Sequence, residues 1–155
     1  MLATDLRNLA RAGARRRLLC VLALCAVGAS CAPTASYPEP PRRGDDLFIA
    51  ASHLTSGAPV FFSYAKGKAK VRFFVLKTDE GVFAFLDACE SCSPRKLGYK
   101  FEDGRLVCRA CNQQFAPPEV ANGFGGCYPI RIPGRGAADG YLIPVAELEK
   151  QVFRF

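Results

Sequence analysis

The sequence predicts an all-β domain, of the β-sandwich or barrel-like type, with a small subdomain built from two C-x-x-C knuckles. Short apolar runs rich in Phe, Val and Tyr are typical of strands that line a buried core. Gly and Pro separate these runs, and no helical pattern alternates with them as it does in βαβ folds. The two cysteine pairs follow the third run.

Three of the apolar runs define the centre of the predicted domain. Between two of them, Asp79, Glu80 and Gly81 supply turn-forming residues, so we expect a hairpin there. The aromatic residues of these runs are expected to fill the core. The predicted strands cover residues 59–64, 71–76, 82–86, 106–108, 128–132 and 141–143, and one or two helical turns are expected within 145–152, after Pro144.

The positive charge of the chain is concentrated at its N-terminus. The formal charge is +7, yet residues beyond Cys31 contain 16 Lys and Arg against 13 Asp and Glu. This distribution does not favour nucleic-acid binding. The apolar run 18–30 follows five Arg residues and has 13 residues, too few to span about 30 Å of hydrocarbon. Residues 1–31 therefore read as a signal peptide, with both general secretory and twin-arginine export open.

A cysteine ends this segment, preceded by the small residues Gly28, Ala29 and Ser30. The pattern resembles the lipobox of bacterial lipoproteins, although Gly28 stands where Leu is usual. It implies lipidation of Cys31 and anchoring on the periplasmic or outer face of a bacterial cell membrane. A soluble secreted protein with an incidental Cys31 is the alternative. The proline-rich residues 32–44 are then expected to form an extended tether, and residues 45–155 the folded domain.

The cysteines of the folded part are regularly spaced. Cys89 and Cys92 form one C-x-x-C pair and Cys108 and Cys111 another, with 15 residues between the pairs and 15 more before Cys127. Both sulfurs of a C-x-x-C knuckle can face one ion while backbone N–H groups hydrogen-bond to them. Four such sulfurs suit zinc, mononuclear iron or an iron–sulfur cluster. We therefore predict a metal centre held by the two pairs.

Other interpretations of the cysteines stay open: structural disulfides, a zinc ribbon and thiol–disulfide exchange. Five cysteines cannot all pair, and no thioredoxin-like βαβ pattern is present. Ser93 and Asn112 stand where a c-type haem motif requires His. The only His is His53, far from the pairs in sequence, and the only Met is Met1, which excludes a blue-copper site.

Three further residues are candidates for the surroundings of the centre. Cys127 follows Gly125 and Gly126, whose backbone can approach the centre closely. It is a candidate fifth or alternative metal ligand, or a redox partner for a knuckle, while a buried thiol that only packs is the simpler explanation. Tyr99 and Tyr128 are expected to line the site, although ordinary core packing explains them equally well.

Residues 81–115 have the layout of a Rieske site. A strand ends in a first ligand pair, a glycine-containing loop follows, and a second pair precedes Phe115. The stretch therefore resembles Rieske proteins and implies a Rieske-like fold. Cys92 and Cys111 stand where those proteins have His, so a 2Fe–2S centre here is expected to have a much lower reduction potential.

Five motifs extend the comparison over about residues 45–145: VRFFVL (71–76), DACESC (87–92), GY (98–99), CRAC (108–111) and GGCYPI (125–130). Together they resemble the bacterial family of iron–sulfur-containing FtrD-like proteins. The resemblance implies a periplasm-facing iron or iron–sulfur domain, associated in some relatives with ferrous iron uptake. Larger relatives carry transmembrane helices before this domain, and this sequence shows none, so we do not expect it to transport iron itself.

We therefore expect an exported protein that binds iron or a 2Fe–2S cluster and acts in electron transfer or periplasmic iron handling. Its expected partner is a redox or iron-transport protein of the membrane. Charged residues around the cysteines are candidates to orient it, although a solvated surface also explains them: Asp87, Glu90, Arg95, Lys96, Arg105 and Arg109. The alternative is a lipoprotein whose cysteines hold structural zinc or copper(I) without redox activity. No acid–base pair or substrate pocket is recognisable, so we expect no catalysis by the chain alone.

Overall fold

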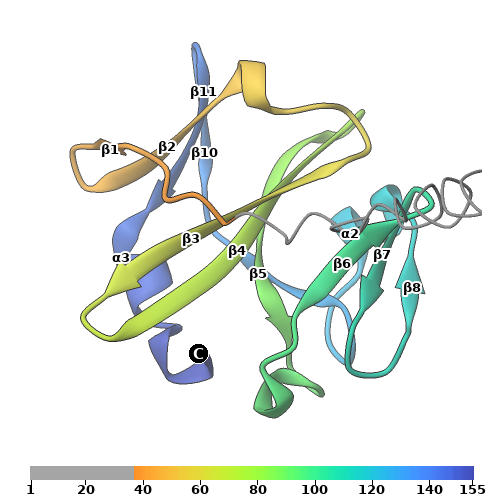
Figure 1. Ribbon diagram of the computed structural model, residues 1–155. Coiled ribbons are helices and arrows are strands. Elements are labelled where there is room, and N and C mark those ends of the chain that lie inside the picture. The colour runs from red at the N-terminus through yellow and green to blue at the C-terminus, as the bar shows by residue number, and fades with distance from the viewer. Residues whose placement is uncertain (1–36) are drawn as a thin grey trace, which may run out of the picture. The chain divides into compact units, whose positions relative to one another are not determined.

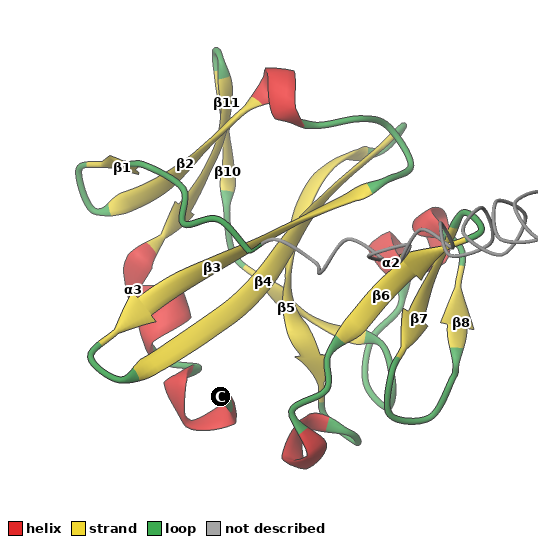
Figure 2. Cartoon of the chain, in the orientation of Figure 1, coloured by secondary structure: helices red, strands yellow, loops and turns green. Residues whose placement is uncertain are grey.

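The computed structural model describes residues 37–155, whose strands form three antiparallel sheets with little helix (Figure 2). This architecture confirms the predicted all-β class. The predicted signal peptide, the lipobox with Cys31 and the first part of the predicted tether lie outside the described residues.

The central sheet has the strand order β3-β4-β5-β9 and contains the Phe-rich runs. Thr78 pairs with Gly81, so Asp79 and Glu80 form the two-residue turn of the predicted hairpin, which is confirmed. The pairing of β5 with β9 shifts register before Cys89. The strands are β3 (Pro59–Lys66), β4 (Ala69–Thr78), β5 (Gly81–Cys89) and β9 (Pro129–Ile132).

The second sheet has the order β1-β2-β11-β10 and pairs strands that are far apart in the sequence. Leu47 pairs with Ile143 and Ile49 with Tyr141. The helix predicted after Pro144 is present as α3. The elements are β1 (Arg42–Arg43), β2 (Asp46–Ala50), η1 (Ala51–His53), β10 (Arg135–Ala137), β11 (Gly140–Pro144), α3 (Val145–Glu149) and η3 (Val152–Arg154).

The third sheet, β6-β7-β8, follows the first cysteine pair and carries the second. Asp103 and Gly104 have φ angles of 49° and 73° and form a two-residue turn between β6 and β7, as an Asp-Gly sequence favours. The elements of this part are η2 (Ser93–Arg95), β6 (Tyr99–Glu102), β7 (Arg105–Cys108), β8 (Gln114–Phe115) and α2 (Pro117–Asn122).

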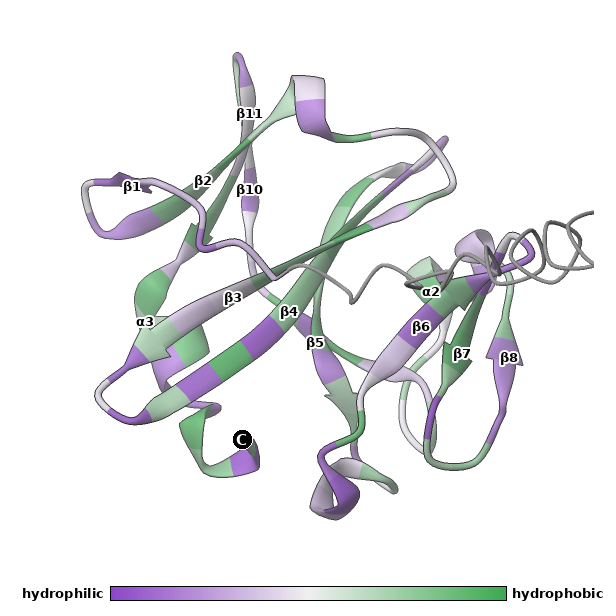
Figure 3. Ribbon diagram, in the orientation of Figure 1, coloured by the Kyte–Doolittle hydropathy of each residue, from purple (hydrophilic) through white to green (hydrophobic). Residues whose placement is uncertain are grey.

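Both faces of the central sheet are buried. Alternate residues of a strand point to opposite sides, so Phe73 packs with the second sheet and α3, while Phe74 packs with the third sheet and α2. Figure 1 shows the central sheet lying between the other two. Because neither face meets water there, the middle of β4 (73–76) and most of β5 are continuously apolar, whereas hydrophilic residues occur towards the ends of β4 (Figure 3). The same alternation places Phe85 and Cys89 on the side of the third sheet.

Five strands were not predicted from the sequence, namely β1, β2, β6, β8 and β10. They have two to five residues each, which is too short for an alternating pattern to stand out. Helix α2 was also not predicted. Two prolines occupy its first turn, where their missing N–H groups cost nothing.

The described part of the predicted tether packs on the domain. The hydroxyl of Tyr37 donates a 2.9 Å hydrogen bond to Asp87, and the N–H of Ser63 donates to the carbonyl of Pro38 at 3.0 Å. Arg43, in β1, pairs with Asp46 of β2. Residues before position 45, where the sequence suggested that the domain begins, therefore contribute to the folded unit.

Phe74 links the central sheet to the third sheet. It is fully buried, its ring stacks on Phe85 with centroids 5.4 Å apart, and it meets Tyr99 edge-on at 6.2 Å. Phe74→Ala leaves a cavity and is expected to lower the free energy of unfolding by about 3–5 kcal/mol, measured by urea unfolding. Phe124, with 91% exposure, is the control, and Phe124→Ala is expected to change stability by less than about 0.5 kcal/mol. Equal losses in both variants would contradict this packing.

Candidate metal centre

The first cysteine pair lies where β5 ends. Cys89 is the last residue of the strand and is buried, and the backbone N–H of Cys92 donates a 3.2 Å hydrogen bond to its Sγ. The chain then turns through η2 and leaves it at Lys96, whose φ is 53°. Arg95 donates a 2.9 Å hydrogen bond to the carbonyl of Ala110, which ties this loop to the second pair.

The second pair begins at the last residue of β7. Burial raises the pKa of the Cys108 thiol, while hydrogen bonds from the backbone N–H groups of Ala110 and Cys111 act in the opposite direction. A hydrogen bond from the backbone N–H of Gln113 lowers the pKa of the Cys111 thiol. Asn112, with φ of 60°, turns the chain back towards β8. Backbone N–H groups thus hydrogen-bond to both sulfurs, and a hydrogen bond of this kind stabilises a thiolate against the effect of burial.

A third loop, between α2 and β9, carries Cys127. Gly125 and Gly126 have φ angles of 71° and 53°, a conformation that glycine adopts without strain. The carbonyl of Gly126 accepts a 3.2 Å hydrogen bond from the N–H of Ser91 in the first knuckle. The carbonyl of Cys127 accepts a 2.6 Å hydrogen bond from the hydroxyl of Tyr99. The loop is therefore held against the first knuckle and against β6.

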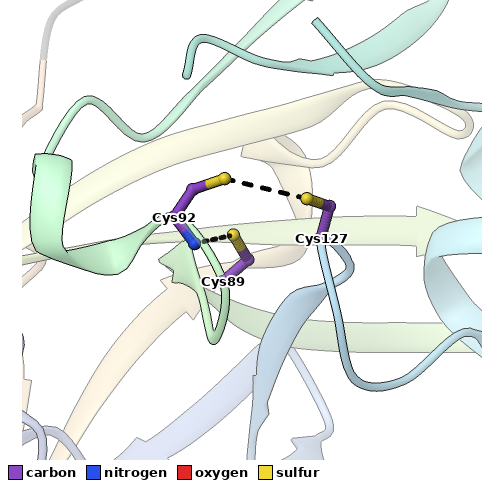
Figure 4. A group of neighbouring side chains, drawn as sticks. All are labelled: Cys89, Cys92 and Cys127. Atoms are coloured by element: carbon purple, nitrogen blue, oxygen red, sulfur yellow. Dashed lines mark hydrogen bonds between the residues drawn. The ribbon is translucent and has the colours of Figure 1, made fainter. Parts of the chain in front are cut away.

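The three loops bring five thiols together. The Sγ of Cys127 lies 3.7 Å from that of Cys92 and 3.4 Å from that of Cys111. The Sγ atoms of Cys89, Cys92 and Cys127 lie within 4.8 Å of one another (Figure 4), as do those of Cys92, Cys108 and Cys111. Sulfurs bound tetrahedrally to one ion at about 2.3 Å lie about 3.8 Å apart. These separations fit metal ligands, and none of the five described cysteines forms a disulfide.

The cluster extends from the core to the surface. Cys89 and Cys108 are buried, Cys92 and Cys127 are half-buried, and Cys111 is exposed. The sulfurs form two groups of three close neighbours. One group is Cys89, Cys92 and Cys127, and the other is Cys92, Cys108 and Cys111, so Cys92 belongs to both. All donors are sulfur, which suits iron, zinc or copper(I) and not calcium or magnesium.

The two tyrosines predicted to line the site differ in their contacts. Tyr99 is buried, and burial, followed by the nearby Cys89 sulfur, raises the pKa of its hydroxyl. Its hydrogen bond to Cys127 makes it part of the support of the cluster. The ring of Tyr128 packs against that of Phe115, with centroids 4.4 Å apart and planes tilted by 39°, so it mainly packs beside the third loop.

Asp87 is not a surface charge, contrary to its suggested role in orienting a partner. The side chain is buried, and burial raises its pKa to about 6. Its carboxylate accepts hydrogen bonds from the N–H of Tyr99 at 2.6 Å and the hydroxyl of Tyr37 at 2.9 Å, and Arg72 lies 3.6 Å away. Sequence reasoning missed this support, although a single acid inside the apolar run of β5 is a signal that can be read.

Comparison with known proteins adds one match. The model of the family described as "Membrane iron-sulfur containing protein FtrD-like" matches residues 54–155. The chain belongs to this family. The match confirms the resemblance seen in the five sequence motifs, and the cysteine cluster lies inside the matched region. No curated protein and no solved structure matches the chain. Within residues 37–155, no helix is long and apolar enough to cross a membrane.

The donor set and the family agree on a thiolate-bound metal centre. Neither of the two groups of cysteine sulfurs contains a histidine, and His53 is exposed in η1. A four-coordinate iron ion and a 2Fe–2S cluster both take thiolate ligands, and both are compatible with this donor set.

Gly98 provides a test of the support under the cluster. Its φ is 68°, and a Cβ at this position would collide with the carboxylate of Asp87. Gly104 has a similar φ of 73° but open space around it, which makes it a matched control. Gly104→Ala is expected to lower the free energy of unfolding by about 1–2 kcal/mol, the cost of a left-handed alanine. Gly98→Ala is expected to cost about 2 kcal/mol more, because it displaces a buried, hydrogen-bonded carboxylate.

Urea unfolding of the two variants measures this difference, and the metal content of Gly98→Ala is expected to fall with its stability. Equal stability of the two variants would mean that Asp87 moves without cost and does not fix the site.

Proposed function

We propose that this domain holds an iron ion or a 2Fe–2S cluster on its cysteine thiolates and serves electron transfer or iron handling outside the cytoplasmic membrane. The observation that carries the proposal is the convergence of thiols from three loops in a member of an iron–sulfur family. Cys89, Cys92, Cys108 and Cys111 would hold the centre, with Cys127 beside them. When bound, such a centre supplies a one-electron redox couple.

The gradient of burial across the cluster supports a redox role over a purely structural one. Cys89 and Cys108 pack in the apolar cluster that also contains Phe74 and Phe85, an environment of low dielectric that tunes a metal centre. Cys111 reaches the surface, where a partner protein can approach within electron-transfer distance.

The location proposed for the domain rests on the N-terminal sequence and on the family description. The Arg-rich segment, the apolar run and Cys31 support export and lipid anchoring. The matched family is described as a membrane protein. A lipid on Cys31 would account for membrane attachment, and the partner would be a redox or iron-transport protein of the same membrane.

The metal content of the protein tests the proposed function. The chain is expressed and purified without oxygen, and iron, zinc, copper and acid-labile sulfide are measured against protein, with an absorption spectrum alongside. Iron with an equal amount of sulfide supports a 2Fe–2S carrier, and iron without sulfide supports a mononuclear site. Zinc or copper alone, under expression with iron available, would refute the redox role and favour a structural or metal-carrying lipoprotein.

Cys108→Ser is expected to lower the metal content at least about tenfold, because the buried ligand is replaced by a hydroxyl that binds soft metals weakly. Ser93→Ala, in the loop of the first knuckle, is the control and is expected to keep the wild-type content. Full metal content in Cys108→Ser would remove Cys108 from the ligand set.

Cys31→Ser is expected to move the protein from the membrane fraction to the soluble exported fraction, because one acylation site is lost. Cys25→Ser, within the apolar run, is the control and is expected to leave the protein in the membrane fraction. Fractionation and metabolic labelling with a fatty acid provide the measurement. Membrane-bound, labelled Cys31→Ser protein would rule out Cys31 as the anchor.

A further inference from the structure

The cluster contains one thiol more than the proposed centres use. Mononuclear iron or zinc takes four thiolates, and so does a 2Fe–2S cluster. The described domain gathers five. One thiol is therefore in excess whichever of these centres is bound, and the contacts of each sulfur indicate where the excess lies.

Three of the thiols are fixed in place. Cys89 and Cys108 are each 2% exposed and receive backbone N–H hydrogen bonds at their sulfurs. Cys92 belongs to both groups of neighbouring sulfurs, so a centre bound by either group needs it. Cys89 and Cys108 therefore cannot leave the cluster without disturbing the core, and Cys92 cannot leave it without disturbing both groups.

Cys111 and Cys127 differ from the other three. Cys111 is exposed, although the N–H of Gln113 hydrogen-bonds to its sulfur, and Cys127 is half-buried like Cys92 but, unlike Cys92, belongs to only one of the two groups. Their sulfurs lie 3.4 Å apart, and each lies within 4.8 Å of Cys92. They come from separate loops, so the side chain of one can rotate without moving that of the other. Cys127 lines a surface hollow of about 430 Å³ together with Phe124 and Gln113, which leaves space for its side chain to turn away from the cluster.

We propose that Cys111 and Cys127 are alternative ligands for a single coordination position, and that Cys89, Cys92 and Cys108 occupy the other three. The inference rests on the proposed function in that it requires a thiolate-bound metal centre. In an exchange, the bond from the metal to one Sγ breaks and the bond to the other forms, and the proton of the incoming thiol passes to the outgoing thiolate. The number of thiolates, the charge and the oxidation state are all unchanged.

This exchange has a direct consequence at the solvent edge of the cluster. The thiol that is not bound to the metal faces water or the hollow. One thiol at this edge can therefore turn towards a partner while the other four remain to bind the metal. Such a position is suited to accepting or releasing a metal ion without unfolding the domain.

The first test compares variants of the full-length chain, purified without oxygen in mild detergent. Cys111→Ser and Cys127→Ser are each expected to keep metal within about twofold of wild type, because the remaining thiol fills the position. The double variant and Cys89→Ser are expected to lose at least about tenfold. If either single variant loses as much metal as Cys89→Ser, or if the double variant keeps its metal, the proposal is wrong.

The second test needs no substitution. Brief iodoacetamide treatment of the metal-loaded wild-type protein is expected to label one thiol per cluster, divided between Cys111 and Cys127. Trypsin cleavage after Arg109 and Arg131 places both on one peptide, residues 110–131, so singly labelled forms are distinguished by fragmentation in a mass spectrometer. Label on only one of the two, or on any of the three fixed cysteines, would overturn the proposal.

Both tests are repeated on protein loaded with cobalt(II), whose thiolate charge-transfer absorption reports the number of sulfur ligands. Four thiolates are expected in the wild type and in each single variant, and three in the double variant. Four cobalt-bound thiolates in the wild type and in both single variants, in protein that takes up no iron, would refute the proposed function and leave the ligand exchange supported. Iron-bound wild type with a fixed fourth ligand would do the reverse.

Discussion

The carboxylate of Asp87 lies on β5 just before the first cysteine pair and is almost completely enclosed by protein. A buried carboxylate is costly unless it is hydrogen-bonded or paired, and here three segments meet that need. Tyr99 donates from β6, Tyr37 from the chain before β1, and Arg72 lies beside it from β4. Because Tyr99 also donates to the carbonyl of Cys127, one acid fixes the positions of the second and third cysteine loops relative to the first.

Because both faces of the central sheet are buried, the side chain of Cys89 at the end of β5 points into protein, where the cysteine cluster lies, and not into solvent. Alternation along the strand directs Phe85 and Cys89 to the side of the third sheet, where Leu106 and Phe115 complete an apolar cluster. The opposite face, with Phe73, packs on the second sheet and holds no cysteine ligand. The domain thus separates a core that stabilises the fold from a smaller one that surrounds the cysteines.

The sequence was informative where its patterns are long or chemically specific. The runs of β3, β4 and β5, the turn at Asp79 and the two cysteine pairs could all be predicted, because strand burial and knuckle formation depend on residues close in sequence. The spacing of the pairs could not predict that two groups of sulfurs share Cys92, since that depends on how three loops approach one another. The place of Asp87 within the apolar run of β5 indicated its burial, but its partners Tyr37 and Arg72 could not be predicted, because they are distant in the chain.

The hydrogen bond from Tyr37 also sets a length scale. Tyr37 is the sixth residue after Cys31, and a fully extended chain of six residues spans about 20 Å. A lipid on Cys31 would therefore confine the cysteine cluster to a thin layer next to one bilayer. The domain could not shuttle across the space between two membranes. Its encounters would be two-dimensional, governed by lateral diffusion and by how high the partner's own site stands above the same lipid surface.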